Sequence, residues 1–164
     1  AENIQFLEKQ LKSNVDAILL IDLLEHIPNC QALISALASH TRLFLIKLPI
    51  ESSIIDDYLL PKEYPSSTHS NGHLREFNVN TVHYFIRSLG LTPMFETLYR
   101  YETKDSFPPL ALGSPLKARL VRIAIMSVKK ILSWILPTKI FLRLVGGGGY
   151  ICVASYNARQ VLNP

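Results

Sequence analysis

Two nearly unbroken apolar runs in the first third of the chain predict buried β-strands. The first covers residues 15–21 (VDAILLI) and the second covers residues 43–48 (LFLIKL), a pattern typical of parallel strands that are covered on both faces. Between them, Pro28 and Asn29 open a segment in which apolar residues recur at helical spacing as far as His40. A strand, a helix and a second strand in this order predict a right-handed βαβ unit, and therefore an α/β fold.

The rest of the chain continues to alternate between helical and strand patterns. Asn78 is suited to begin a helix and Gly90 to end it in a left-handed conformation, and Pro137 is expected to stop a longer helix. Residues 4–11 also show helical spacing. The further elements expected are helices over residues 78–90 and 116–136, a shorter helix ending at Val145, a turn at the glycine run 146–149, and strands over residues 91–101 and 150–154.

Two stretches lack such periodicity. The connection over residues 49–78 is rich in Ser, Pro and Tyr and carries His69 and His73 at its tip, and a connection of this length predicts a lid or a binding loop. Residues 106–115 are rich in proline and predict a break. We therefore expect a single partial domain with three parts: a βαβαβ part at 1–105, a helical insertion at 106–145, and a closing strand and tail at 146–164.

The composition excludes several classes of protein. With 164 residues, of which 48% are hydrophobic and 18% charged, the chain resembles one globular domain and is unlike a disordered tail, a collagen or a disulfide scaffold. Its two cysteines, Cys30 and Cys152, are far apart in the sequence and form no CxxC motif. Since nothing resembles a cleavable signal peptide, we expect a cytoplasmic location.

The charge is distributed unevenly along the chain. All 13 acidic residues lie within residues 1–105, where there are 9 basic ones, whereas residues 106–164 carry 8 basic residues and no Asp or Glu. A segment of one sign favours an anionic partner such as a phospholipid surface, a phosphorylated substrate or, with less support, a nucleic acid. It is equally compatible with acidic neighbours on the same protein.

The basic helix at 116–136 is also strongly apolar, which raises the question of a membrane. Lys129 and Lys130 lie near its middle, and two lysines there would oppose a transmembrane position. Two interpretations stay open. The helix lies flat on a membrane or over the active site, or it packs on the sheet with its cations in water.

A polar cluster directly follows the first apolar run. Asp22, Glu25 and His26 are three and four residues apart, so a helical turn would place them on one side of the chain. Ligands of open α/β sheets bind beyond the carboxyl ends of the strands. This position predicts a functional site, although local capping by Glu25 and His26 would explain them equally well.

The residues of this region resemble a known family. VDAILLIDLLEHIP at 15–28 is similar to the fourth strand and following loop of class I S-adenosylmethionine (SAM)-dependent methyltransferases with an LEH motif. Four later segments resemble the fifth strand, the entry and end of the fifth helix, and the last strand of that family, in the family's order. They are residues 42–49, 72–77, 88–91 and 148–154. The resemblance covers most of the chain.

The same resemblance shows what is missing. The family binds SAM with a glycine-rich turn after its first strand and an acidic residue after its second, and neither is present. We therefore expect the C-terminal half of a Rossmann-like methyltransferase sheet, mostly parallel with an antiparallel last strand, and inactive by itself. The strand at 15–21 would then be an exposed edge, to be paired in a homo-oligomer or with a separate N-terminal half.

Roles for individual residues follow from the resemblance. Asp22 and Leu23 would border the methionine part of SAM, whereas His26 and His73, as catalytic residues, and Lys47 would face the methyl acceptor. His69 would belong to the same acceptor pocket. Tyrosines such as Tyr99 and Tyr101 either line that pocket or form the edge of the core.

The resemblance also implies a metal. In methyltransferases acting on the ribose of small RNAs, and in related ubiquinone-pathway enzymes, an E-x-x-E-H motif and a later His bind a divalent ion. The matching residues are Asp22, Glu25, His26 and His73, although Asp22 is one methylene shorter than the family's Glu. Carboxylates and imidazoles suit such an ion.

The sequence thus predicts the C-terminal part of a SAM-dependent methyltransferase that acts on a small-molecule or lipid-linked acceptor. The alternative is a non-catalytic binding or assembly module whose basic C-terminal region contacts an anionic surface, which includes peripheral contact with a membrane.

Overall fold

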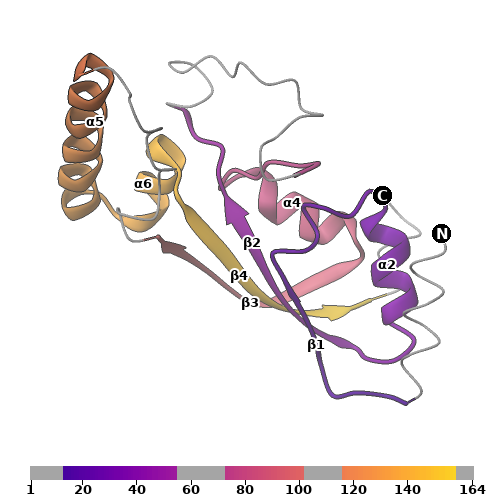
Figure 1. The fold of residues 1–164 in the computed structure, drawn as a ribbon. Helices are drawn as coiled ribbons and strands as arrows, with labels where there is room; N and C mark the ends of the chain where they lie inside the picture. Colours follow the sequence, from indigo (N-terminus) through magenta and orange to yellow (C-terminus); the bar gives the residue numbers. More distant parts are fainter. Residues whose placement is uncertain (1–12, 55–72, 102–115, 158–164) are drawn as a thin grey trace.

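The computed structural model describes residues 13–54, 73–101 and 116–157 (Figure 1). The expected helix at 4–11, most of the long connection with His69, and the proline-rich break lie outside the described residues. The elements, in chain order, are β1 (Ile18–Ile21), α2 (Cys30–Leu37), β2 (Leu43–Ile50), α4 (Thr81–Ser88), β3 (Leu91–Arg100), α5 (Leu116–Ile135), α6 (Thr138–Val145) and β4 (Gly148–Tyr156). They form an α/β fold.

The four strands form one mixed sheet in the order β1-β2-β4-β3. β1 and β2 are parallel, as the βαβ pattern predicts, and Ile21 lies beside Lys47. β4 is antiparallel to both β2 and β3, so the first three strands run in one direction and the last runs against them. The last strand is therefore antiparallel as expected. Because it lies between β2 and β3, only one pair of neighbouring strands is parallel, although three of the four described strands run in one direction as expected.

The hydrophobic core lies on one face of this sheet. Alternate side chains of β2 and β4, such as Phe44, Ile46 and Tyr150, are buried in one cluster with residues of α2 and α4. In β1 only Leu20 is buried, while Leu19 and Ile21 on the other face are 61% and 56% exposed. For the described residues, the prediction that this strand is covered on both faces is therefore wrong. The predicted span of residues 15–21 is also wrong, because β1 has four residues.

The expected asparagines cap the two core helices, but Asn78 does so from outside the first turn of α4. The side chain of Asn29 accepts a hydrogen bond from the backbone N–H of Ala32 at the start of α2. The Asn78 side chain accepts the N–H groups of Asn80 and Thr81 at 2.9 Å each, so it caps the helix from outside its first turn. Gly90 follows α4 with φ of 75°, the left-handed value that glycine adopts without strain.

The two C-terminal helices lie at one end of the molecule, with α5 beside α6 (Figure 1). Arg100 at the end of β3 contacts both helices. Its guanidinium donates to the carbonyls of Ser133 and Leu136 at the end of α5 and lies over the ring of Phe141 in α6 at 5.0 Å from the centroid. A cation is favourable at the carbonyl end of a helix. No helix among the described residues combines the length and apolar character required to cross a membrane.

Candidate functional site

The candidate site lies where the parallel strands end. Asp22 directly follows β1, has a positive φ of 46°, and its backbone N–H donates to the carbonyl of Lys47 at 3.2 Å. Aspartate tolerates this left-handed conformation better than most residues. The chain then turns, and His26 donates its N–H to the carbonyl of Leu23 at 3.0 Å. This turn directs Glu25 into the protein instead of toward solvent.

Glu25 is the unusual residue of the site. It is fully buried, with 0% of its surface exposed, and within the described part of the chain neither carboxylate oxygen has a hydrogen-bond partner. Burial raises the pKa of this carboxyl above its ordinary value, and the negative charge of Asp22 adds to the effect. A buried carboxylate without a partner is costly, so Glu25 is suited to a cationic ligand more than to a structural role.

Two imidazoles complete a cluster around this carboxylate. The ring centroids of His26 and His73 are 4.7 Å apart in an edge-to-face arrangement. One ligand atom from each of Glu25, His26 and His73 lies within 4.8 Å of the other two. Three of the residues predicted from the sequence therefore come together. One carboxylate and two imidazoles form a donor set that divalent transition metals accept.

A second carboxylate supports the cluster from outside. The Nδ1 atom of His73 lies 2.7 Å from Oε2 of Glu51, and the His73 side chain is only 9% exposed. Histidines that bind metals generally donate their other ring N–H to a carboxylate or a carbonyl, which fixes the ring. Glu51 stands in this relation to His73. Sequence reasoning missed Glu51, although an acid directly after the second buried strand was a usable signal.

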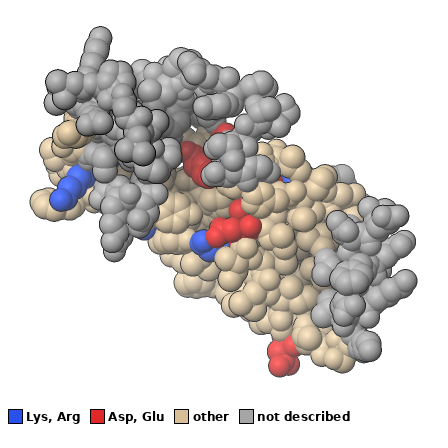
Figure 2. Space-filling model, in the orientation of Figure 1, with Lys and Arg blue, Asp and Glu red and all other residues tan. Residues whose placement is uncertain are grey.

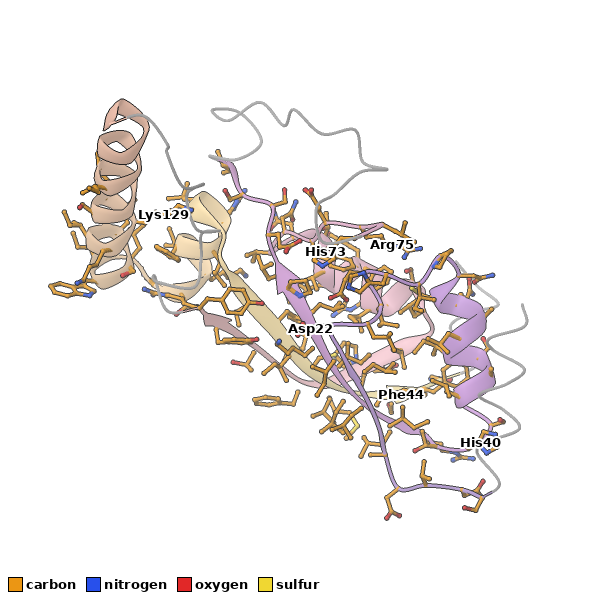
Figure 3. The ribbon with its side chains drawn as sticks, viewed as in Figure 1. Asp22, His40, Phe44, His73, Arg75 and Lys129 are labelled. Atoms are coloured by element: carbon orange, nitrogen blue, oxygen red, sulfur yellow. The ribbon has the colours of Figure 1, made fainter. Side chains whose placement is uncertain are left out.

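The segment after His73 holds the turn in place. The N–H of Leu74 donates to the carbonyl of Glu25 at 2.8 Å. The guanidinium of Arg75 donates to the carbonyls of Leu24, Ile27 and Pro28, and Figure 3 shows His73 and Arg75 on the same side of the sheet. The turn and the residues from 73 onward thus form one hydrogen-bonded unit.

Asp22 forms an ion pair with Lys47 instead of joining the three-residue cluster. In Figure 2 an acidic and a basic group meet near the middle of the view, where Figure 3 labels Asp22. The hydrogen bond to Asp22 raises the pKa of Lys47. The pair lies beside the cluster, at the position where sequence analysis expects SAM and the acceptor to meet.

Two tyrosines lie next to this ion pair. The rings of Tyr99 and Tyr101 are 5.7 Å apart. Burial raises the pKa of Tyr101, and the charges of Tyr99, Asp22 and Glu51 raise it further, so its hydroxyl stays protonated near neutral pH and is able to donate a hydrogen bond. Of the other predicted residues, Leu23 adjoins Asp22 with its side chain partly exposed, and His69 lies outside the described residues.

Cys152 and His40 contribute nothing to this cluster, whereas the Cys30 thiol supports the turn by donating to the carbonyls of Leu24 and Ile27 at 3.2 Å each. Burial raises the pKa of both thiols, to about 11 for Cys152, so both remain protonated and unreactive near neutral pH. His40 lies at the opposite end of the sheet from His73 (Figure 3).

The arrangement offers a cation the ligand atoms of Glu25, His26 and His73, and the neighbouring Lys47 and Tyr101 are protonated and able to donate hydrogen bonds. Compared with models of known protein families and with curated proteins, the chain matches none of them.

Proposed function

We propose that this chain is the acceptor-binding part of a SAM-dependent methyltransferase, and that Glu25, His26 and His73 bind a divalent metal next to the methyl acceptor. The observation that carries the proposal is the fully buried Glu25 carboxylate, which has no hydrogen-bond partner among the residues that the structure describes and adjoins two imidazoles. A cation would supply the partner that this carboxylate lacks.

The arrangement of the strands supports the transferase part of the proposal. The resemblance implies strands of one direction with an antiparallel last strand, and β1, β2 and β3 run in one direction with β4 against them. The LEH residues follow β1, at the carboxyl end of the parallel pair, where ligands of α/β sheets bind.

The residues present fit a divalent metal. Glu25 would neutralise part of its charge, His26 and His73 would provide nitrogen ligands, and Glu51 would orient His73. When bound, the metal would lower the pKa of an acceptor hydroxyl and so favour its attack on a methyl group. The Asp22–Lys47 pair and Tyr101 would position the two substrates at the rim of the cluster.

Metal binding is tested by titrating Co²⁺ into the full chain and recording its visible absorption, which reports coordination by nitrogen and oxygen. We expect Glu25→Gln and His73→Gln to abolish the signal, and Glu51→Gln to weaken binding by roughly ten- to a hundredfold. His40→Gln at the far end of the sheet is the matched control and should bind as the parent does. Equal binding by the parent and by Glu25→Gln would contradict the metal proposal.

Methyl-donor binding is tested separately by calorimetry with S-adenosylhomocysteine, the demethylated product of SAM. Because no glycine-rich turn follows an early strand of the chain, we expect little heat with the chain alone and clear binding after addition of the N-terminal half of an LEH-motif methyltransferase. Binding of Co²⁺ without binding of the product in either sample would retain the metal site and reject the transferase.

A further inference from the structure

The outward face of α5, from Ile123 to Ile135, carries an apolar stripe. Its exposed apolar side chains include Trp134, 81% exposed, and Ile135, 71% exposed. Ile123, Val128 and Ile131 are also more than half exposed. Ile131 lies three residues from Val128 and Trp134, four from Ile135 and eight from Ile123, so helical periodicity places all five on one side of the helix. Soluble proteins rarely leave such a stripe uncovered.

The stripe points away from the body of the protein. Leu132 and Leu136 on the other side of the helix end pack against the hydrophobic core, and Arg100 holds the carbonyls of Ser133 and Leu136. The orientation of α5 is therefore set by its contacts. In Figure 1 the helix stands at the end of the molecule, beyond α6.

The charges of the helix indicate what covers this stripe. The sequence of α5 contains five basic residues and no acidic one, and the basic residues are Lys117, Arg119, Arg122, Lys129 and Lys130. The ammonium group of Lys130 lies 5.9 Å from the centroid of the Trp134 ring, at the border of the stripe. The neighbouring helix α6 adds an exposed Lys139 and a partly exposed Ile140.

We propose that α5 docks flat on an anionic phospholipid surface, with its apolar stripe at the level of the acyl chains and with Lys130 and the neighbouring Lys139 at the phosphates. An apolar face with tryptophan, bordered by cations, is the pattern of helices that lie in the membrane interface. The absence of acidic residues from α5 makes its charge complementary to anionic headgroups. A protein partner would need an equally acidic rim around an apolar groove.

Docking would also place the candidate site close to the membrane. Gly147, directly after α6, donates its N–H to the carbonyl of Ile50 and accepts the N–H of Tyr101, so the C-terminal helices join the sheet at the end that carries Glu51 and the cluster. This consequence rests on the proposed function, and it favours a lipid-linked acceptor over a freely diffusing one. The docking itself does not depend on it.

Trp134 provides a direct test, because it is the only tryptophan of the chain. Its fluorescence is recorded while vesicles of phosphatidylcholine with phosphatidylserine, or of phosphatidylcholine alone, are added to the full chain. We expect a blue shift and quenching by brominated lipids with the anionic vesicles only, and reversal by salt. No spectral change with anionic vesicles, or an equal change with both kinds of vesicle, would overturn the proposal.

Variants distinguish vesicle binding through the stripe from non-specific binding to vesicles. Ile131→Asp should weaken vesicle binding by about tenfold or more, and Lys130→Gln with Lys139→Gln should weaken it by about fivefold for each charge removed. Tyr84→Asp, at an exposed apolar position on α4, is the control and should bind normally. A blue-shifted Trp134 without lipid, together with a dimer in sedimentation, would show that a second copy covers the stripe and would reject the proposal.

Discussion

Glu25 is expected to destabilise the metal-free protein at neutral pH. Its pKa is raised from 4.5 in the folded state, so the folded state holds this proton more tightly than the unfolded state, and stability falls as the pH rises above 4.5 through the raised pKa. Glu25→Gln removes the ionisation and should raise the free energy of unfolding by about 1 kcal/mol near pH 7.5. Urea denaturation in EDTA measures this.

The gain should disappear well below pH 4.5, where Glu25 is protonated in both the folded and the unfolded state of the parent. A variant that is less stable than the parent near pH 7.5 would mean that the carboxylate makes a stabilising contact.

The residues of the site were predictable only where the sequence places them side by side. Glu25 and His26 share a motif, and the resemblance supplied His73. Glu51 was missed because its contact with His73 at 2.7 Å crosses a long connection. The pairing of Asp22 depends on strand register, since Ile21 lies beside Lys47, and an apolar pattern does not determine which residues face each other across two parallel strands.

At the scale of the elements, Arg100 is expected to control the stability of the end of α5. Arg100→Ala removes the donors to Ser133 and Leu136, which leaves carbonyls at the helix end without these partners. Amide hydrogen exchange in the last turns of α5 should become about tenfold faster or more. Hydrogen exchange with mass spectrometry measures this, with α2 as an internal standard.

Arg42→Ala, an exposed arginine before β2, is the matched variant and should leave exchange in α5 unchanged. If Arg100→Ala also left it unchanged, the hydrogen bonds of this arginine would not hold the helix.

Elements with strong periodicity were predictable, and their burial was not. The helices at α2 and α4, the parallel pair and the stop at Pro137 follow from local patterns that the structure confirms. β1 proved short and exposed on one face, because burial of a strand depends on which elements cover the sheet, and its own apolar residues do not specify them. The position of β4 between β2 and β3 is likewise a property of the assembled sheet.

At the scale of the whole molecule, the outer edge of β1 and the uncovered sheet face predict association. Among the described residues β1 pairs with β2 alone, and Leu19, Ile21 and Phe95 are exposed on the same face as Ile151. An apolar edge strand of this kind favours pairing with another chain. We expect sedimentation velocity to show concentration-dependent association, which Leu19→Lys with Ile21→Lys should reduce.

The stripe on α5 is a separate apolar surface, so Ile131→Asp should leave this association unchanged. A monomer at every concentration would contradict the expectation from β1.

The place of β4 in the sheet constrains how the protein is made. β4 comes last among the described strands, yet it alone joins β2 to β3. A nascent chain must therefore expose the apolar edges of both strands until residues 148–156 have left the ribosome, and contacts this distant in sequence form slowly. Newly synthesised copies should consequently depend on chaperones, and premature termination before Gly148 would leave two fragments of a sheet with no strand to connect them.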